Sequence, residues 1–346
     1  MNTVRSNPAR TSMLLLLIAI AGLFYVKWFP YYQKAFVAAN THAIGKSILM
    51  GTASNAPDPS LQSAIDYAIA YGNAIWKAMV LGLLLGSGVQ ALLPRQWVAR
   101  ALGGGGFGSV MAGGVLSLPG MMCTCCAAPV VVGLRARQAS PGAAMAFWLG
   151  NTVLNPATLV FMGFVLGWNW TVLRLVLGVL MVFGLGYAMN RLVTPQEAQA
   201  AQQWVAQGAE EEGSVFARWL KILGRMTLRL LPEYIVLVLL LGAVRAFLFP
   251  HIGPDIGNGI GWIVAFAVAG TLFVIPTAGE VPIIQAMLSL GMGVGPAGAL
   301  LMTLPPVSVP SLAMLLKSFS KKMLVVVVGA VVGFGVVAGL LATLLF

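Results

Sequence analysis

The chain has 346 residues, of which 59% are hydrophobic and only 8% are charged, and its net charge is +11. Soluble domains carry about 25% charged residues, so this composition excludes a soluble globular protein and indicates a protein embedded in the lipid bilayer. The basic residues stand at the ends of apolar segments and form no basic run with interleaved aromatics, which argues against a nucleic-acid partner.

Several apolar segments are long enough to cross a hydrocarbon core of about 30 Å. In chain order they cover residues 13–29, 72–93, 143–167, 169–190, 230–249, 294–316 and 323–345. The first is followed by Lys-Trp-Phe-Pro rather than by the small residues of a signal-peptide cleavage site, so we expect a retained anchor helix. The expected fold class is all-α, a polytopic membrane protein with about seven spanning helices.

Two further apolar stretches, residues 101–134 and 258–291, are interrupted near their middle, the first at Pro119 and the second at Pro276. Each half is too short to span the bilayer comfortably, so we expect two re-entrant hairpins made of half-helices. Irregular backbone at this depth is tolerated only where it is buried in protein or lines a water-filled cavity.

The chain divides into an N-terminal anchor helix and outer segment (1–71), a first repeat with a cysteine-bearing hairpin (72–190), a cytoplasmic linker (191–229) and a second, inverted repeat (230–346). Most Lys and Arg residues fall on one side of this topology, which favours a cytoplasmic N-terminus in the inner (plasma) membrane. Arg95 and Arg135 flank the first hairpin, which therefore enters and leaves on the cytoplasmic side. A smaller basic set, including Lys27, Lys34 and Arg174, lies outside or near the outer ends of spans.

The two halves of the chain repeat the same pattern of prolines. The pairs, separated by 153 to 157 positions, are Pro94 and Pro250, Pro119 and Pro276, Pro129 and Pro282, and Pro156 and Pro310. The first copy begins its span from outside and the second from inside, so the copies have opposite topology. Inverted repeats with interrupted segments at matching positions are typical of transporters with a binding site near the bilayer midplane.

All three cysteines, Cys123, Cys125 and Cys126, lie at the break of the first hairpin. Sulfur is a soft donor that suits Cu(I), Zn or thiophilic metalloids. We therefore take the three cysteines as candidate metal and substrate ligands, with the neighbours Cys125 and Cys126 as a pair and Cys123 nearby. The alternative is that they only pack as small apolar side chains.

Glu280 is the acidic residue at the break of the second hairpin. An ionisable side chain at this depth costs on the order of 2.5–3.5 kcal/mol on insertion scales, so it is a functional candidate by default. We expect it to couple transport to protons. The alternative is a carboxylate that reaches water at the outer surface.

Polar residues in the interrupted spans are further candidates for substrate binding. Asn151 and Asn155 are four residues apart and share one helix face. Asn155 precedes Pro156, which frees backbone carbonyls where it breaks the helix. Thr124 and Ser308 are weaker candidates of the same kind. Hydrogen bonding between packed helices is the competing explanation for the asparagines.

Three stretches carry a resemblance to a known family: Cys126-Ala-Ala-Pro-Val-Val-Val-Gly133, Ala139-Ser-Pro-Gly-Ala-Ala-Met-Ala-Phe147, and Asn155-Pro156. They resemble the predicted-permease family that includes the ArsP organoarsenical exporters. The resemblance implies efflux of trivalent organoarsenicals, or in some relatives of copper or zinc, with cysteines at this hairpin as ligands. The chain departs from the family pattern at Ala127-Ala128 and Arg137-Gln138, which concerns the substrate rather than the fold.

The leading hypothesis is a secondary-active permease, not an enzyme, that exports a soft metal(loid) or related thiophilic solute without a cofactor. Its partners would be a small-molecule or ion substrate and the lipid bilayer, and a homodimer is left open. One alternative is a transporter of a small sulfur-containing anion, with hairpin helix N-termini facing the charge. The other is a membrane thiol–disulfide oxidoreductase, which would depend on a partner because the chain has no second cysteine pair.

Overall fold

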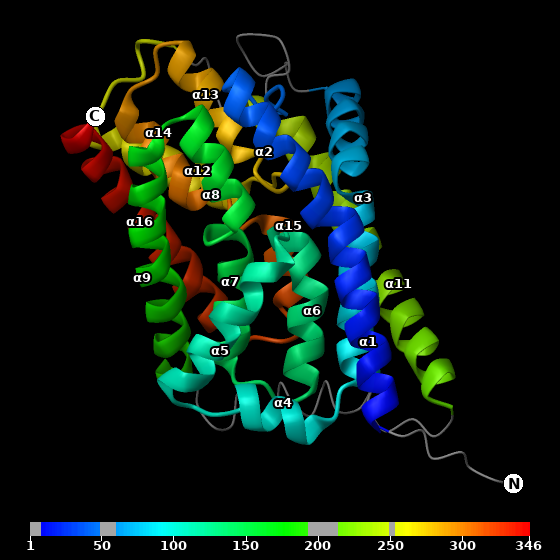
Figure 1. Cartoon of the computed structure of the whole chain (residues 1–346). Coiled ribbons are helices and arrows are strands. Elements are labelled where there is room, and N and C mark those ends of the chain that lie inside the picture. Colours follow the sequence, from blue (N-terminus) through cyan, green and yellow to red (C-terminus); the bar gives the residue numbers. More distant parts are fainter. Residues whose placement is uncertain (1–7, 49–59, 193–213, 249–252) are drawn as a thin grey trace, which may run out of the picture.

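The computed structural model describes residues 8–48, 60–192, 214–248 and 253–346. Part of the expected outer segment (49–59), part of the expected linker (193–213) and Pro250 of the proline repeat lie outside the described residues. The described chain folds into helices joined by short loops, as shown in Figure 1.

The first half contains a long N-terminal helix with a π-helical centre and two hairpin arms between spanning helices. Its elements are α1 (Pro8–Leu23), a π-helix (Phe24–Trp28), α2 (Phe29–Thr41), α3 (Leu61–Leu92), α4 (Arg95–Leu102), α5 (Phe107–Ser117), α6 (Thr124–Ala136), α7 (Pro141–Val153), α8 (Pro156–Val165) and α9 (Trp168–Leu192). The second half consists of α11 (Val215–Leu248), α12 (Ile260–Leu272), α13 (Glu280–Ser289), α14 (Val294–Thr303), α15 (Val309–Leu315) and α16 (Lys321–Leu345).

The same order of elements occurs twice. A long helix, a hairpin, a broken helix and a second long helix are α3, α5–α6, α7–α8 and α9 in the first half, and α11, α12–α13, α14–α15 and α16 in the second. The hairpin α5–α6 lies toward the end of the molecule where α1 begins, and α12–α13 lies toward the opposite end (Figure 1). The predicted all-α fold with inverted repeats and two re-entrant hairpins is confirmed.

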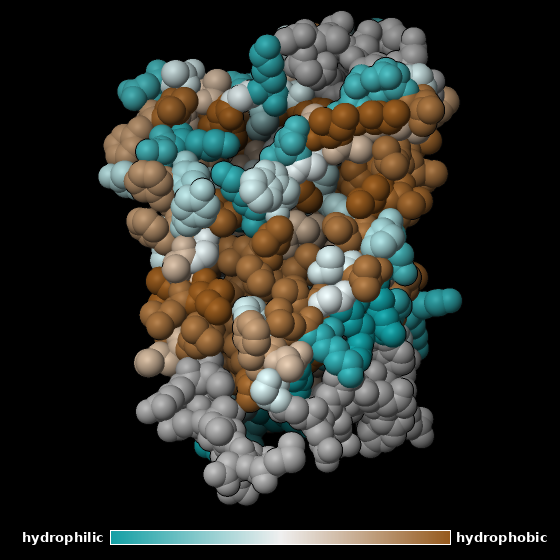
Figure 2. Space-filling view, turned by 90° about the vertical axis from the view of Figure 1, so that its right-hand side faces the viewer, coloured by the Kyte–Doolittle hydropathy of each residue, from teal (hydrophilic) through white to brown (hydrophobic). Residues whose placement is uncertain are grey.

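Six helices in the described residues are long and apolar enough to cross a membrane, or up to seven if the pair α4–α5, bent by 109°, is counted as one span. The face in Figure 2 has a broad hydrophobic area across its middle, with hydrophilic residues above and below it. Large apolar side chains on α1, α3, α9, α11 and α16 are exposed. The chain is therefore a multi-pass membrane protein, because such a surface is stable only against lipid.

Several helices extend beyond the apolar windows that predict them. The N-terminal span continues to Thr41 rather than ending at residue 29, α3 begins at Leu61 rather than 72, and α11 begins at Val215 rather than 230. Hydropathy marks the part of a helix that lies in hydrocarbon and not its ends. The start of α3 is set by a cap instead, since the Ser63 amide donates to the Ser60 hydroxyl at 3.0 Å.

Glycines on α3 bring this helix into direct backbone contact with α6, the cysteine-bearing arm. A Cβ atom at Gly82 would lie 2.2 Å from the carbonyl oxygen of Cys126, and one at Gly86 would lie 2.3 Å from that of Pro129. Small residues that let helix backbones approach closely are a common way of packing helices in membranes. The position of α6 therefore depends on the absence of side chains on this face of α3.

We expect Gly86→Ala to lower the melting temperature of the purified protein in detergent, because the new methyl group displaces α6. Overpacking of this kind costs about 1–3 kcal/mol. Gly72→Ala is the matched control on the same helix, since a Cβ there meets nothing within 4 Å. Equal melting temperatures for the two variants would contradict the close contact of α3 with α6.

Candidate functional site

The tip of the first hairpin is a short turn held by α7, exposed at Pro119 and buried from Met122 onward. Residues Leu118–Gly120 form a 3-10 turn, Met121 has a left-handed backbone (φ 47°), and Cys123 is the residue before the first turn of α6. The Asn151 side chain accepts from the Met122 amide at 3.4 Å. The Trp148 indole donates to the Thr124 carbonyl at 3.0 Å. Asn151 thus holds the tip by a hydrogen bond, and its role in substrate binding stays a prediction.

The cysteines are buried and free, and they are arranged differently from the expected neighbour pair. The Sγ atoms of Cys123 and Cys126 are 2.8 Å apart. Cys125 points elsewhere, with its Sγ 3.9 Å from the Tyr71 hydroxyl and 4.0 Å from that of Ser308. Cys123 is the N-cap of α6 and Cys126 is its third residue, a spacing at which the N-cap side chain reaches over the first turn, so the start of α6 brings these two sulfurs together.

The second half of the chain meets the first at this point. The Thr124 and Ser308 hydroxyl oxygens are 3.4 Å apart, and Ser308 caps α15 at the break of the second broken helix. Both side chains are buried. Asn155 does not join this cluster: its Oδ1 caps α8 by accepting from the amides of Ala157 at 3.1 Å and Thr158 at 3.3 Å. Its buried Nδ2 has no hydrogen-bond partner in the described part of the chain.

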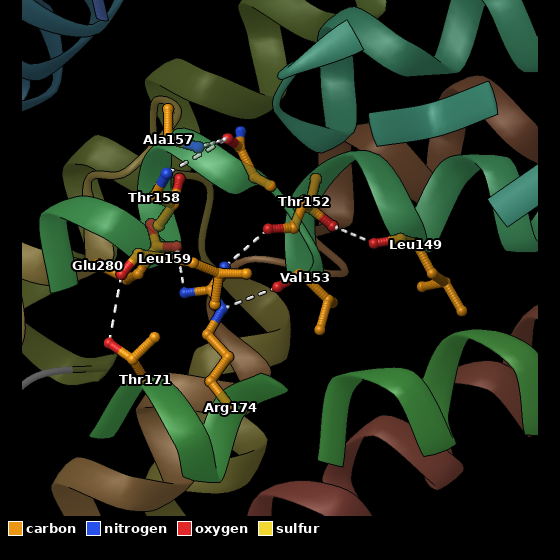
Figure 3. A network of polar contacts seen from close by, with 10 residues as sticks. Leu149, Thr152, Val153, Ala157, Thr158, Leu159, Thr171, Arg174 and Glu280 are labelled. Atoms are coloured by element: carbon orange, nitrogen blue, oxygen red, sulfur yellow. Dashed lines mark hydrogen bonds and ion pairs between the residues drawn. The ribbon is translucent and has the colours of Figure 1, made fainter. Parts of the chain in front are cut away.

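Glu280 begins α13 and is only 2% exposed, as its position at the second break predicts. Its Oε1 lies 2.6 Å from a terminal nitrogen of Arg174, which is fully buried on α9. Figure 3 shows the same guanidinium reaching the backbone of α7, where it donates to the Val153 carbonyl at 3.0 Å and to the Thr152 carbonyl at 2.7 Å. The pair thus links the two halves of the chain.

Arg174 was not recognised as a site residue in the sequence, where it was placed near the outer end of a span. Two signals point to it: it is an arginine in the middle of an apolar run, and Glu280 is a buried carboxylate that needs a cation. The proton-coupling role of Glu280 stays a prediction.

Lys27 is a further buried residue that the sequence placed outside. It lies in the π-helix and is 4% exposed. Its ammonium group donates to the Tyr31 hydroxyl at 3.1 Å and to the Thr277 hydroxyl, at the break of the second hairpin, at 3.0 Å. The adjacent Trp28 indole donates to the Pro119 carbonyl of the first hairpin at 2.8 Å. The N-terminal helix therefore touches both hairpin tips, and π-helical turns often occur at such functional positions.

Cavities connect these groups. A cavity of about 390 Å³ is lined by residues of the N-terminal helix and α3, by Pro276–Gly279 of the second hairpin, and by Cys123. A void of about 10 Å³, room for roughly one water molecule, is lined by Cys123, Thr277 and Glu280. Within the residues that the structure describes, no group of three or more His, Cys, Asp or Glu side chains is placed to hold a metal ion. The site therefore offers two close sulfurs beside a cavity.

The sequence profile of a family described as predicted permeases matches residues 121–344, from the cysteine cluster to the last helix. The chain belongs to this family. The permease is 52% identical to the UPF0718 protein YraQ of Escherichia coli over 96% of its own length and 94% of that protein. It is 37% identical to the UPF0718 protein MJ0584 of Methanocaldococcus jannaschii over 32% of its own length and 31% of that protein. No solved structure matches the permease.

Removing one charge of the buried pair should destabilise the permease strongly. We expect Glu280→Gln or Arg174→Gln to lower stability by about 3–5 kcal/mol, because each leaves the other charge buried without its partner. The measurement is thermal unfolding in detergent.

The exposed pair of Lys317 and Glu233, 3.8 Å apart with both side chains accessible, is the control. Glu233→Gln should change stability by about 1 kcal/mol or less. If Glu280→Gln has no larger effect than Glu233→Gln, the Arg174–Glu280 pair is not formed as described.

Proposed function

We propose that this permease is a secondary-active transporter that exports a thiophilic small solute, a soft metal(loid) or a related molecule that bonds to sulfur. The observation that carries the proposal is the Cys123–Cys126 pair, with sulfurs 2.8 Å apart at the start of α6 and Cys123 lining a cavity. Two sulfurs on one helix face can bind one soft atom between them. The hydroxyls of Thr124 and Ser308 lie beside the cysteines, where they can orient the bound solute.

The chemistry of such a site is ligand exchange. For a trivalent arsenical such as methylarsenite, two As–S bonds form as two As–OH bonds break, and the two thiol protons leave with the hydroxyls as two water molecules. No oxidation takes place, so the exchange is reversible and the cargo can be released on the other side. The membrane-buried position keeps competing water away from the sulfurs.

Alternating access is supported by the inverted repeat, because exchanging the conformations of two similar halves opens the site to opposite sides. The Arg174–Glu280 pair joins α9 of the first half to α13 of the second. We propose that a proton opens it: protonated Glu280 no longer holds the guanidinium, which keeps the carbonyls of Thr152 and Val153. The void that both Cys123 and Glu280 line supports this coupling, because it brings the two side chains to the same small space.

We propose that the permease lies in the inner membrane with its N-terminus in the cytoplasm, since this orientation places most Lys and Arg residues inside. The start of α1 and the end of α16 lie at opposite ends of the molecule (Figure 1). Phe346 should therefore lie outside the cytoplasm. A fusion of alkaline phosphatase to Phe346 should be active, and a fusion of green fluorescent protein there should be non-fluorescent. The reverse result would invert the topology.

Replacing either sulfur of the pair should impair transport more than replacing Cys125. We expect Cys123→Ser and Cys126→Ser to reduce vesicle transport of thiophilic cargo at least about tenfold, since each removes one of two soft ligands. The panel is methylarsenite, arsenite, Cu(I), Zn and thiosulfate. Cys125→Ser should cause a smaller loss, because its sulfur faces Tyr71 and Ser308 instead.

Each variant is first checked for normal elution as a folded protein in detergent. Unchanged transport of every cargo in Cys123→Ser and Cys126→Ser would remove the assignment of the sulfur pair. Activity that depends on an added oxidant rather than on an ion gradient would favour thiol–disulfide exchange instead.

A further inference from the structure

The cavity that reaches Cys123 is strongly basic. The described residues that line it include four lysines, Lys27, Lys34, Lys46 and Lys77, and no Asp or Glu. Lys34, Lys46 and Lys77 are exposed, whereas Lys27 is buried, so the lysines lead from the solvent-exposed rim to the interior. Clefts lined by charges of one sign concentrate counter-ions and raise their association rates.

Lys27 has no carboxylate within ion-pair distance among the described residues, and its bonds to Tyr31 and Thr277 use two of three N–H donors. The thiols of Cys123 and Cys126 are acidic groups near Lys27, and while they are protonated the buried ammonium is stabilised by an anion that supplies the opposite charge. Glu280, which lines the adjoining void, is already paired with Arg174 and cannot serve. The N-terminal end of α6 adds partial positive charge at Cys123 itself.

We propose that the cargo of this permease is a small anion with a soft sulfur end, of which thiosulfate is the simplest example, and that it moves between the cysteine pair and the outer side past the four lysines. This inference rests on the proposed transport function and names an anion as its cargo. Lys27 binds the charged oxygen end, and the thiols of Cys123 and Cys126 donate S–H hydrogen bonds to the outer sulfur, so no covalent bond forms or breaks. The same lysines disfavour free Cu(I) and Zn cations, because like charges repel along the whole path.

The electrostatic effect of the lysines can be measured without knowing the cargo, from the rates at which charged thiol reagents modify Cys123. In a Cys125→Ala/Cys126→Ala background, Cys123 is the remaining thiol of the chain. We expect the anionic reagent 2-sulfonatoethyl methanethiosulfonate to modify it at least about tenfold faster than the cationic trimethylammonium reagent, after normalisation to a free thiol in solution. Lys27→Gln should lower the ratio of the anionic to the cationic modification rate about threefold or more, and Lys27→Arg should preserve this ratio.

Exposed lysines provide a test that leaves the core untouched. Lys34→Gln/Lys46→Gln should reduce the ratio mainly at low salt, since exposed charges are screened at high salt. Lys317→Gln, which removes a lysine that does not line the cavity, is the control and should leave the ratio unchanged. A ratio near one, a preference for the cationic reagent, or no modification of Cys123 by either reagent would overturn the proposal.

Transport assays distinguish a failure of the anion inference from a failure of the proposed function. Lys27→Gln should raise the KM for thiosulfate about tenfold, the loss of roughly one charge-assisted hydrogen bond, and should leave methylarsenite transport within about twofold. Equal losses for both cargoes would overturn the anion inference. Two results together would reject the anion inference alone. If Cys123→Ser abolishes transport, the permease assignment stands. If lysine substitution leaves the ratio of anionic to cationic modification rates unchanged, the lysines do not select the charge of the cargo.

Discussion

Backbone carbonyls at the ends of half-helices lose their helical partners, and where lipid excludes water they need other hydrogen-bond donors. In this permease side chains provide several: Arg174 donates to Thr152 and Val153 at the end of α7, and Trp28 donates to Pro119 in the turn that follows α5. An unsatisfied carbonyl in hydrocarbon costs several kcal/mol, so these donors stabilise the breaks in the helices. The donors come from other helices, which ties the hairpin tips to the surrounding bundle.

The same requirement places chemically active groups at the centre. A helix that stops inside the membrane exposes its first-turn amides and last-turn carbonyls, and both attract charge. Cys123 and Glu280 stand at the starts of α6 and α13, the two half-helices that follow the breaks. The broken helices thus create the polar interior, and the cysteines and the buried pair occupy it.

The sequence predicted the fold better than the contacts within the site. The proline pattern and apolar windows located both hairpins, the broken helices and the opposite orientation of the halves, because they depend on local backbone rules. Glu280 was found because a carboxylate is rare at such depth. All three cysteines were predicted as candidate ligands, but Cys125 was paired with Cys126, whereas the closest sulfurs are those of Cys123 and Cys126.

Lys27, Arg174 and Tyr71 were missed for a different reason. Their partners, Thr277, Glu280 and Cys125, are 250, 106 and 54 positions away in the chain. A positively charged residue near a predicted span end is normally a topology signal, so Lys27 and Arg174 were interpreted as such. The folded arrangement shows that both cations point inward.

The helix formed by α1, the π-helix and α2 occurs once, outside the twofold repeat, and yet it binds both hairpin tips through Trp28 and Lys27. A change in the distance between the two hairpin tips must therefore break one of these hydrogen bonds or carry the N-terminal helix along with a tip.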